Sequence, residues 1–106
     1  MKASLFSRQV KLGVFSLNLI DESMGIVGGT IYPTEEYFKN YQQIFRKHLE
    51  KPNFDKISKL QLKVVTQDGE ELKPMGGIVV TDIKKYADHI TVEVCGVDSM
   101  VMKKIR

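Results

Sequence analysis

The chain has 106 residues, of which 42% are hydrophobic and 27% charged, and its formal net charge is +3. This length suits a single domain, residues 1–106, and the composition is that of a globular rather than a disordered protein. The lone cysteine, Cys95, excludes an internal disulfide, and no apolar run approaches the roughly 20 residues that cross a bilayer. We therefore expect a cytoplasmic protein with no membrane partner.

The first elements in the chain are an expected leader and a long strand. Residues 1–8 show no strong pattern, and we expect a loosely ordered leader there. Residues 9–21 alternate apolar and polar side chains, but the alternation shifts by one residue just after Gly13. Because side chains alternate strictly along a strand, this shift predicts either burial on both faces or a β-bulge, and the glycine favours the bulge.

A second strand is expected over residues 26–32, after the turn residues Asp21–Gly25. The two strands should form an antiparallel hairpin. Gly28 and Gly29 lie inside the second strand, where glycine costs stability because it has no side chain to pack. We expect a close backbone approach, a bulge or a sharp bend at this pair.

A helix is expected to begin after Thr34, whose hydroxyl can cap the first turn, and to end at Pro52. Glu35 and Glu36 place negative charge at the positive end of the helix dipole. Apolar and aromatic side chains recur at spacings of three and four, which predicts one continuous buried stripe. The stripe comprises Tyr37, Phe38, Tyr41, Ile44, Phe45, His48 and Leu49.

A second hairpin is expected after a loop over residues 53–59. Residues 60–64 alternate as a half-buried strand, and Gln67-Asp68-Gly69 turns the chain back. Only a three-residue loop with Gly69 in the left-handed conformation places Val64 opposite Leu72, so that apolar side chains share one face. The pattern therefore predicts a type I turn followed by a G1 bulge.

The remaining chain is expected to add strands to the sheet. We expect strands over residues 78–83 and 89–97, joined by a polar connection with a short helical turn, and an edge strand or tail over 100–106. The predicted order is β-β-α-β-β-β-β. The expected fold class is α+β, with a single amphipathic helix packed on a mostly antiparallel twisted sheet.

No residue pattern supports catalysis, a cofactor or a metal. His48 and His89 have no second ligand nearby in the sequence, and Cys95 has no group to lower its pKa. Asp82 is unusual because it continues the inward phase of its strand, and we expect it to mark the strand terminus. The sequence leaves the question of an enzyme open and favours a protein that is not one, and we expect no cofactor or metal.

Three functions remain open, in decreasing order of expectation. The first is a protein–protein interaction module of the accessory, adaptor or immunity type, which uses a sheet edge or the sheet face opposite the helix to bind another protein or a second copy of itself. The residues expected on that face are Phe15, Leu17, Leu19, Val65 and Val79.

The second is nucleic-acid binding through a scattered basic surface that includes Lys59, Lys63, Lys73, Lys84 and Lys85. The third is a small-molecule site near the glycine pairs Gly28-Gly29 and Gly76-Gly77, provided that His89, Cys95 or Asp82 gathers there.

Overall fold

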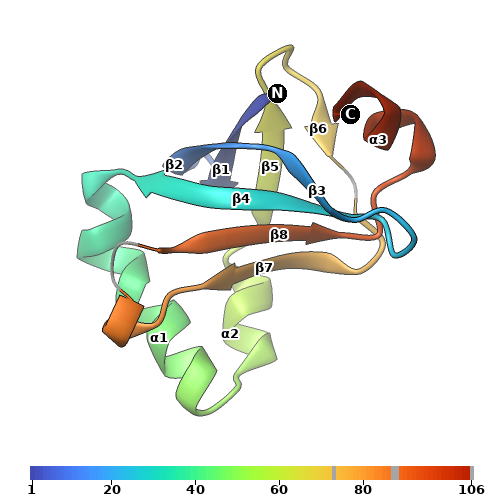
Figure 1. Ribbon diagram of the computed structural model, residues 1–106. Helices are drawn as coiled ribbons and strands as arrows, with labels where there is room; N and C mark the ends of the chain where they lie inside the picture. Colours follow the sequence, from blue (N-terminus) through green and yellow to red (C-terminus); the bar gives the residue numbers. More distant parts are fainter. Residues whose placement is uncertain (73, 87–88, 106) are drawn as a thin grey trace.

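The computed structural model describes residues 1–72, 74–86 and 89–105. It confirms the α+β class, with an antiparallel sheet and several helices (Figure 1). The strands are β1 (Lys2–Ser7), β2 (Val10–Ser16), β3 (Asn18–Asp21), β4 (Ile26–Pro33), β5 (Leu62–Thr66), β6 (Glu71–Leu72), β7 (Gly77–Thr81) and β8 (Thr91–Cys95). The helical elements are η1 (Tyr37–Tyr41), α1 (Gln42–Glu50), α2 (Phe54–Lys59), η2 (Lys84–Tyr86) and α3 (Ser99–Ile105).

The sheet runs in the order β6-β5-β1-β2-β4-β8-β7, and β3 also pairs with β4. It curls so that β1, β5 and β6 lie behind the layer formed by β4, β8 and β7 (Figure 1). The apolar side chains of both layers fill the space between them, with Leu5, Leu12, Val27, Val64 and Val92 fully buried. The main path of the sheet ends at β6 and at β7, and β3 has β4 as its one partner among the described strands.

The expectation of a loosely ordered leader over residues 1–8 is wrong. Residues Lys2–Ser7 form β1, which lies between β2 and β5 and pairs with both. Its inward side chains are Ala3, Leu5 and Ser7, all buried. The hydropathy pattern of this strand was weak because two of its three inward residues, Ala3 and Ser7, are small.

The β-bulge expected near Gly13 is confirmed. Leu5 pairs with Gly13 and the next residue, Phe6, pairs with Lys11, so Leu12 is the extra residue. Leu12 and Gly13 are consecutive buried positions, which is the phase shift seen in the sequence. The expected long strand is also interrupted once more, between Ser16 and Asn18, and this break separates β2 from β3.

The expected first hairpin is confirmed by the pairing of β3 with β4. The close backbone approach at the glycine pair is confirmed as well. A Cβ on Gly28 would lie 2.1 Å from the carbonyl oxygen of Val92, and one on Gly29 would lie 2.2 Å from that of Ser16. Neighbouring backbone on both sides of β4 therefore excludes any side chain at these two positions.

The main helix begins after Thr34 as expected, and its first turn is capped by a bond from the Tyr37 amide to the Thr34 hydroxyl (3.4 Å). Residues Tyr37–Tyr41 form a π-helical turn, in which the amide of Gln42 bonds the carbonyl of Tyr37. A π turn holds one more residue than an α turn and so shifts every later side chain around the axis.

The expectation of one continuous buried stripe is wrong, because this extra residue changes the direction of the side chains. Tyr37 and Phe45 are buried and stack with ring centroids 6.0 Å apart. Phe38 and Leu49, which were expected in the same stripe, are exposed. The spacing rule failed because it assumes a uniform α-helical turn along the whole segment.

The loop expected over residues 53–59 is instead helix α2, and the sheet is therefore not covered by a single helix. The Asn53 side chain caps this helix by accepting a bond from the Lys56 amide at 3.1 Å. The second hairpin is confirmed, with Val64 opposite Leu72 and Gly69 at a φ of +86°.

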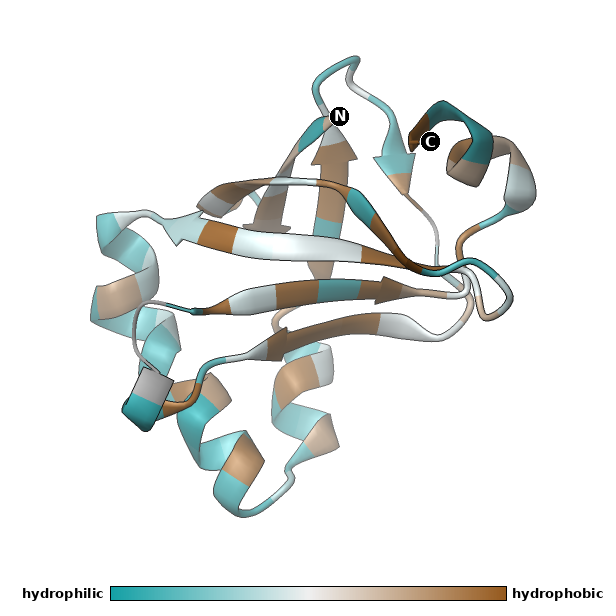
Figure 2. Ribbon diagram, in the orientation of Figure 1, coloured by the Kyte–Doolittle hydropathy of each residue, from teal (hydrophilic) through white to brown (hydrophobic). Residues whose placement is uncertain are grey.

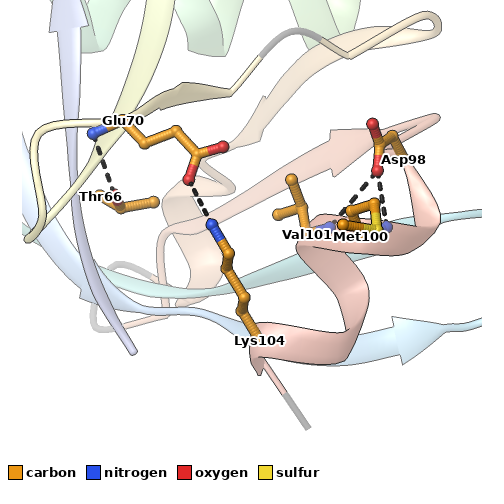
Figure 3. A network of polar contacts seen from close by, with 6 residues as sticks. All are labelled: Thr66, Glu70, Asp98, Met100, Val101 and Lys104. Atoms are coloured by element: carbon orange, nitrogen blue, oxygen red, sulfur yellow. Dashed lines mark hydrogen bonds and ion pairs between the residues drawn. The ribbon is translucent and has the colours of Figure 1, made fainter.

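The end of the chain was wrongly expected to be an edge strand or tail, because residues Ser99–Ile105 form helix α3. The Asp98 carboxylate accepts bonds from the amides of Met100 and Val101 at the helix start (Figure 3). Met102 packs into the core, and Lys104 forms an ion pair with Glu70 at 3.2 Å (Figure 3). This ion pair links helix α3 to the β5–β6 hairpin.

The strands expected over residues 78–83 and 89–97 are present as the shorter β7 and β8, with a 3₁₀ turn, η2, after β7. Ile90, Val92 and Val94 are buried as expected. Two residues of the expected polar connection, 87 and 88, lie outside the described part of the chain. Helices α1 and α2 lie beside β7 at one side of the sheet, and α3 lies at the opposite side (Figure 1).

Candidate binding surfaces on the helical side

A buried polar cluster links the main helix to the end of β7. Asp82 is 0% exposed and accepts two bonds, from the Tyr37 hydroxyl (2.6 Å) to one carboxylate oxygen and from the Arg46 Nε (3.1 Å) to the other. The Arg46 side chain is 19% exposed, so its charge lies at the border between core and solvent. Asp82 follows β7 directly, as expected for a strand terminus, and its inward phase is explained by these two partners.

Burial, together with the hydrogen bond and the charge of Asp82, raises the pKa of Tyr37 well above its usual range. The Tyr37 ring is fully buried, and its hydroxyl therefore stays protonated and donates to Asp82. The clear effect of the cluster is to hold the Arg46 side chain in one place, because a buried carboxylate needs a charged partner.

The edge strand β7 offers unpaired backbone groups. The Ile31 amide bonds the Ile90 carbonyl, so in β8 residues 90, 92 and 94 bond towards β4. Since backbone groups of an antiparallel strand point alternately to either side, Thr91, Glu93 and Cys95 bond towards β7. The backbone groups of Ile78 and Val80 therefore point away from β8, and no described element pairs with them.

An apolar groove opens beside this edge. We call it the edge groove; it has a volume of about 560 Å³ and lies between α2, the β5–β6 hairpin and the start of β7. Its apolar lining is Phe54, Ile57, Leu62, Leu72, Pro74 and Ile78. The Phe54 side chain is 73% exposed, which is unusual for a large aromatic residue with no polar atom. The groove occupies the gap between the two edges of the curled sheet.

The net positive charge is segregated in space although it is even along the sequence. Residues 35–59 and 82–86, which form the helices beside β7, hold eight basic and five acidic side chains. The basic ones are Lys39, Arg46, Lys47, Lys51, Lys56, Lys59, Lys84 and Lys85, and the acidic ones are Glu35, Glu36, Glu50, Asp55 and Asp82. The rest of the chain holds eight basic and eight acidic residues, so the net charge of +3 lies on the helical side.

Six of these eight basic residues line two adjoining cavities. The first, of about 530 Å³, lies between α1 and η2, and the second, of about 360 Å³, lies between α1 and α2. Lys47 and Glu50 line both. We call the six basic residues that line the two cavities the basic strip: Arg46, Lys47, Lys51, Lys56, Lys84 and Lys85. Only Glu50 and Asp82 oppose them among the lining residues.

The residues expected to form an apolar partner face are not all exposed. Phe15 and Leu17 are buried in the core, because the sheet curls and the face that carries them is the inner one. The expectation that they lie on an uncovered face opposite the helix is therefore wrong for these two. Leu19 and Val65 are half-buried, and Val79 is 47% exposed on the outer side of the edge strand β7. The structure does not bring the five residues together on one surface.

The other sequence candidates do not converge. Backbone fills the space beside Gly28 and Gly29, and Gly76 lies against Cys95. Cys95 pairs with Gly77 at the start of β7, whereas Asp82 lies beyond its other end. Burial and the nearby Glu93 charge raise the pKa of the Cys95 thiol, which disfavours the nucleophilic thiolate.

His48 accepts a bond from the Asn53 amide at 2.8 Å and packs edge-on against Phe54. It therefore supports the turn between α1 and α2. In residues 1–72, 74–86 and 89–105 no group of three or more metal-ligating side chains gathers.

The basic residues proposed from sequence are only partly gathered. Lys84 and Lys85 line the first cavity, Lys63 lies over the Phe6 ring and lines the edge groove, and Lys73 lies outside the described residues. Sequence analysis missed Phe54 and Arg46. The signal for Phe54 was present, since Asn53 followed by Asp55 is a typical helix start. Nothing in the sequence indicated that Arg46 reaches Asp82.

Comparisons with protein-family models, curated proteins and solved structures found no match to this chain. Among the described helices, none has the length and apolar character needed to span a bilayer. The edge groove and the basic strip are therefore the surfaces from which a function can be inferred.

Proposed function

We propose that the protein is a protein–protein interaction module. More specifically, it captures an extended segment of another protein, which adds to β7 as a further strand and places side chains in the edge groove. The observation that carries this proposal is the unpaired backbone of β7 directly beside an apolar groove.

Two features favour an extended protein segment as the occupant. The outward-pointing backbone groups of Ile78 and Val80 recur at every second residue of β7. The backbone of an extended protein segment has the same spacing and can pair with them. The apolar residues Phe54, Pro74 and Ile78 line the groove that side chains of that strand would enter. An exposed apolar groove beside an open edge is also a risk for aggregation, and a bound segment removes that risk.

The test uses peptides of about ten residues, the length of a long strand, selected from a random displayed library against the wild-type chain. We expect selected peptides to alternate apolar and polar residues. Their affinity should fall about tenfold or more for Phe54→Ala, which is about 1.4 kcal/mol or more of binding free energy. Tyr32→Ala is the matched control, because both rings are 73% exposed and Tyr32 is not among the residues that line the groove.

A second variant tests the strand edge itself. Ile78→Pro removes an amide that points away from β8, so the ladder between β7 and β8 stays intact. We expect peptide binding to be lost while the thermal unfolding midpoint changes little. Equal loss of affinity in Phe54→Ala and Tyr32→Ala, or unchanged affinity in Ile78→Pro, would contradict the proposal. A concentration-dependent dimer of the wild-type chain would instead identify a second copy as the occupant.

A further inference from the structure

We infer that the basic strip binds the phosphate backbone of single-stranded nucleic acid, independently of the edge groove. The inference starts from the charges lining the two adjoining cavities, where six basic side chains face two acidic ones. One of the two acids, Asp82, is fully buried and already paired with Arg46. The other lining acid, Glu50, lies outside this buried pair.

Helix stability explains only part of this clustering. Lys47 and Lys51 lie near the negative end of the α1 dipole, which favours cations. Lys51 is the extended residue that follows α1, and it lines the same cavity as Lys47, so their like charges repel each other. The dipole does not explain why η2 adds Lys84 at the first cavity, or why α2 adds Lys56 at the second. An anionic ligand would relieve this mutual repulsion.

Arg46 is the residue of the basic strip whose side chain is held in place by a buried partner. Its Nε bonds the buried Asp82, whose second oxygen is held by Tyr37, so the guanidinium loses little freedom when a ligand binds. Arg46 lines the first cavity and can donate to phosphate oxygens through its terminal nitrogens. A guanidinium held in this way matches the planar, paired geometry with which arginine recognises phosphate.

The shape of the strip favours a polymer over a small anion. The cations follow α1 across two cavities that share Lys47 and Glu50, and a single phosphate would contact only a few of them. A nucleic-acid strand carries one negative charge at every nucleotide and can contact the whole strip. The cavities are bordered by flexible lysines rather than by a groove of fixed width, which suits a single strand better than a duplex.

The test measures fluorescence anisotropy of a labelled single-stranded oligonucleotide of about 12 nucleotides at salt concentrations from about 50 to 200 mM. The key variant is Lys47→Gln/Lys84→Gln, and the matched control is Lys2→Gln/Lys11→Gln, which removes the same charge on β1 and β2. Wild type and control should bind alike. The key variant should bind about tenfold more weakly, and its salt slope should fall by about 1.4, for two lost phosphate contacts.

Several results would overturn the inference. Equal weakening in both double variants would show that only net charge matters, and no binding at the lowest salt would remove the site. Equal affinity for a polyglutamate peptide would assign the strip to an acidic protein. Full competition by inorganic phosphate at the same phosphate concentration would assign it to a small anion. Because neither double variant changes the lining of the edge groove, peptide binding there serves as a folding control.

Discussion

Strands β4 and β7 lie two positions apart in one sheet, yet they have opposite surroundings. β4 has neighbours on both sides that come so close that Gly28 and Gly29 cannot carry a side chain. Among the described strands β7 pairs with β8 alone, so it keeps backbone groups that no described strand pairs with, and it exposes Val79. The difference separates two parts of the sheet: its centre is closely packed, and its edge, with the helices beside it, carries the surfaces that we propose for binding.

The largest expected effect tests the centre of the sheet. Gly29→Ala would place a Cβ within 2.2 Å of the Ser16 carbonyl oxygen, and a backbone atom cannot move aside cheaply. We expect a loss of about 3 kcal/mol or more in the free energy of unfolding, measured by urea denaturation. Val79→Thr, at the exposed edge, should change it by less than about 0.5 kcal/mol. Similar losses in the two variants would contradict the comparison.

A smaller loss is expected where the helices join the edge. Asp82→Ala leaves the Tyr37 hydroxyl and the Arg46 Nε without their acceptor, which should cost about 2 to 3 kcal/mol of unfolding free energy. The matched control Asp68→Ala lies in the exposed hairpin turn and should cost about 0.5 kcal/mol or less. If Asp82→Ala were as stable as the control, the cluster would not anchor the helix.

The smallest effect concerns pH. The pKa of Tyr37 is raised in the folded state, so the unfolded chain releases this proton first, near its ordinary pKa of about 10. The contribution of the protonated Tyr37 hydroxyl to the free energy of unfolding is therefore complete below about pH 10 and is lost as pH rises above it. In that range wild type should lose stability faster than Tyr37→Phe, by up to about 1.4 kcal/mol per pH unit. Tyr32→Phe should follow wild type, and a wild-type slope equal to that of Tyr37→Phe would contradict the assignment.

The parts of the fold that could be predicted from the sequence are those whose signal lies within a few neighbouring residues. The bulge near Gly13, the tight packing of Gly28-Gly29 and the turn at Gly69 were all predictable, because each leaves a mark within a few residues. β1 was missed because its inward residues include Ala3 and Ser7, which carry little hydropathy signal. Its place in the middle of the sheet is set by distant partners.

The helices and the binding surfaces show the same limit. The π turn at Tyr37–Tyr41 removed Phe38 from the predicted stripe, and no spacing rule anticipates an extra residue in a turn. The curl of the sheet buried Phe15 and Leu17, which a flat sheet would have left on its second face. The hydropathy pattern along the strands is readable in the structure (Figure 2), but the curvature that decides which face is inside is a tertiary property.

The position of β1 has a consequence for how the chain assembles. β1 can form a hairpin with β2 at once, but its other neighbour, β5, begins at Leu62, some 55 residues beyond Ser7. During synthesis the first strand therefore waits, with one side unpaired, until more than half of the chain has been made. Closing so long a loop is slow compared with forming local contacts, and it places this chain among the slower small folders, in the range of about milliseconds to seconds.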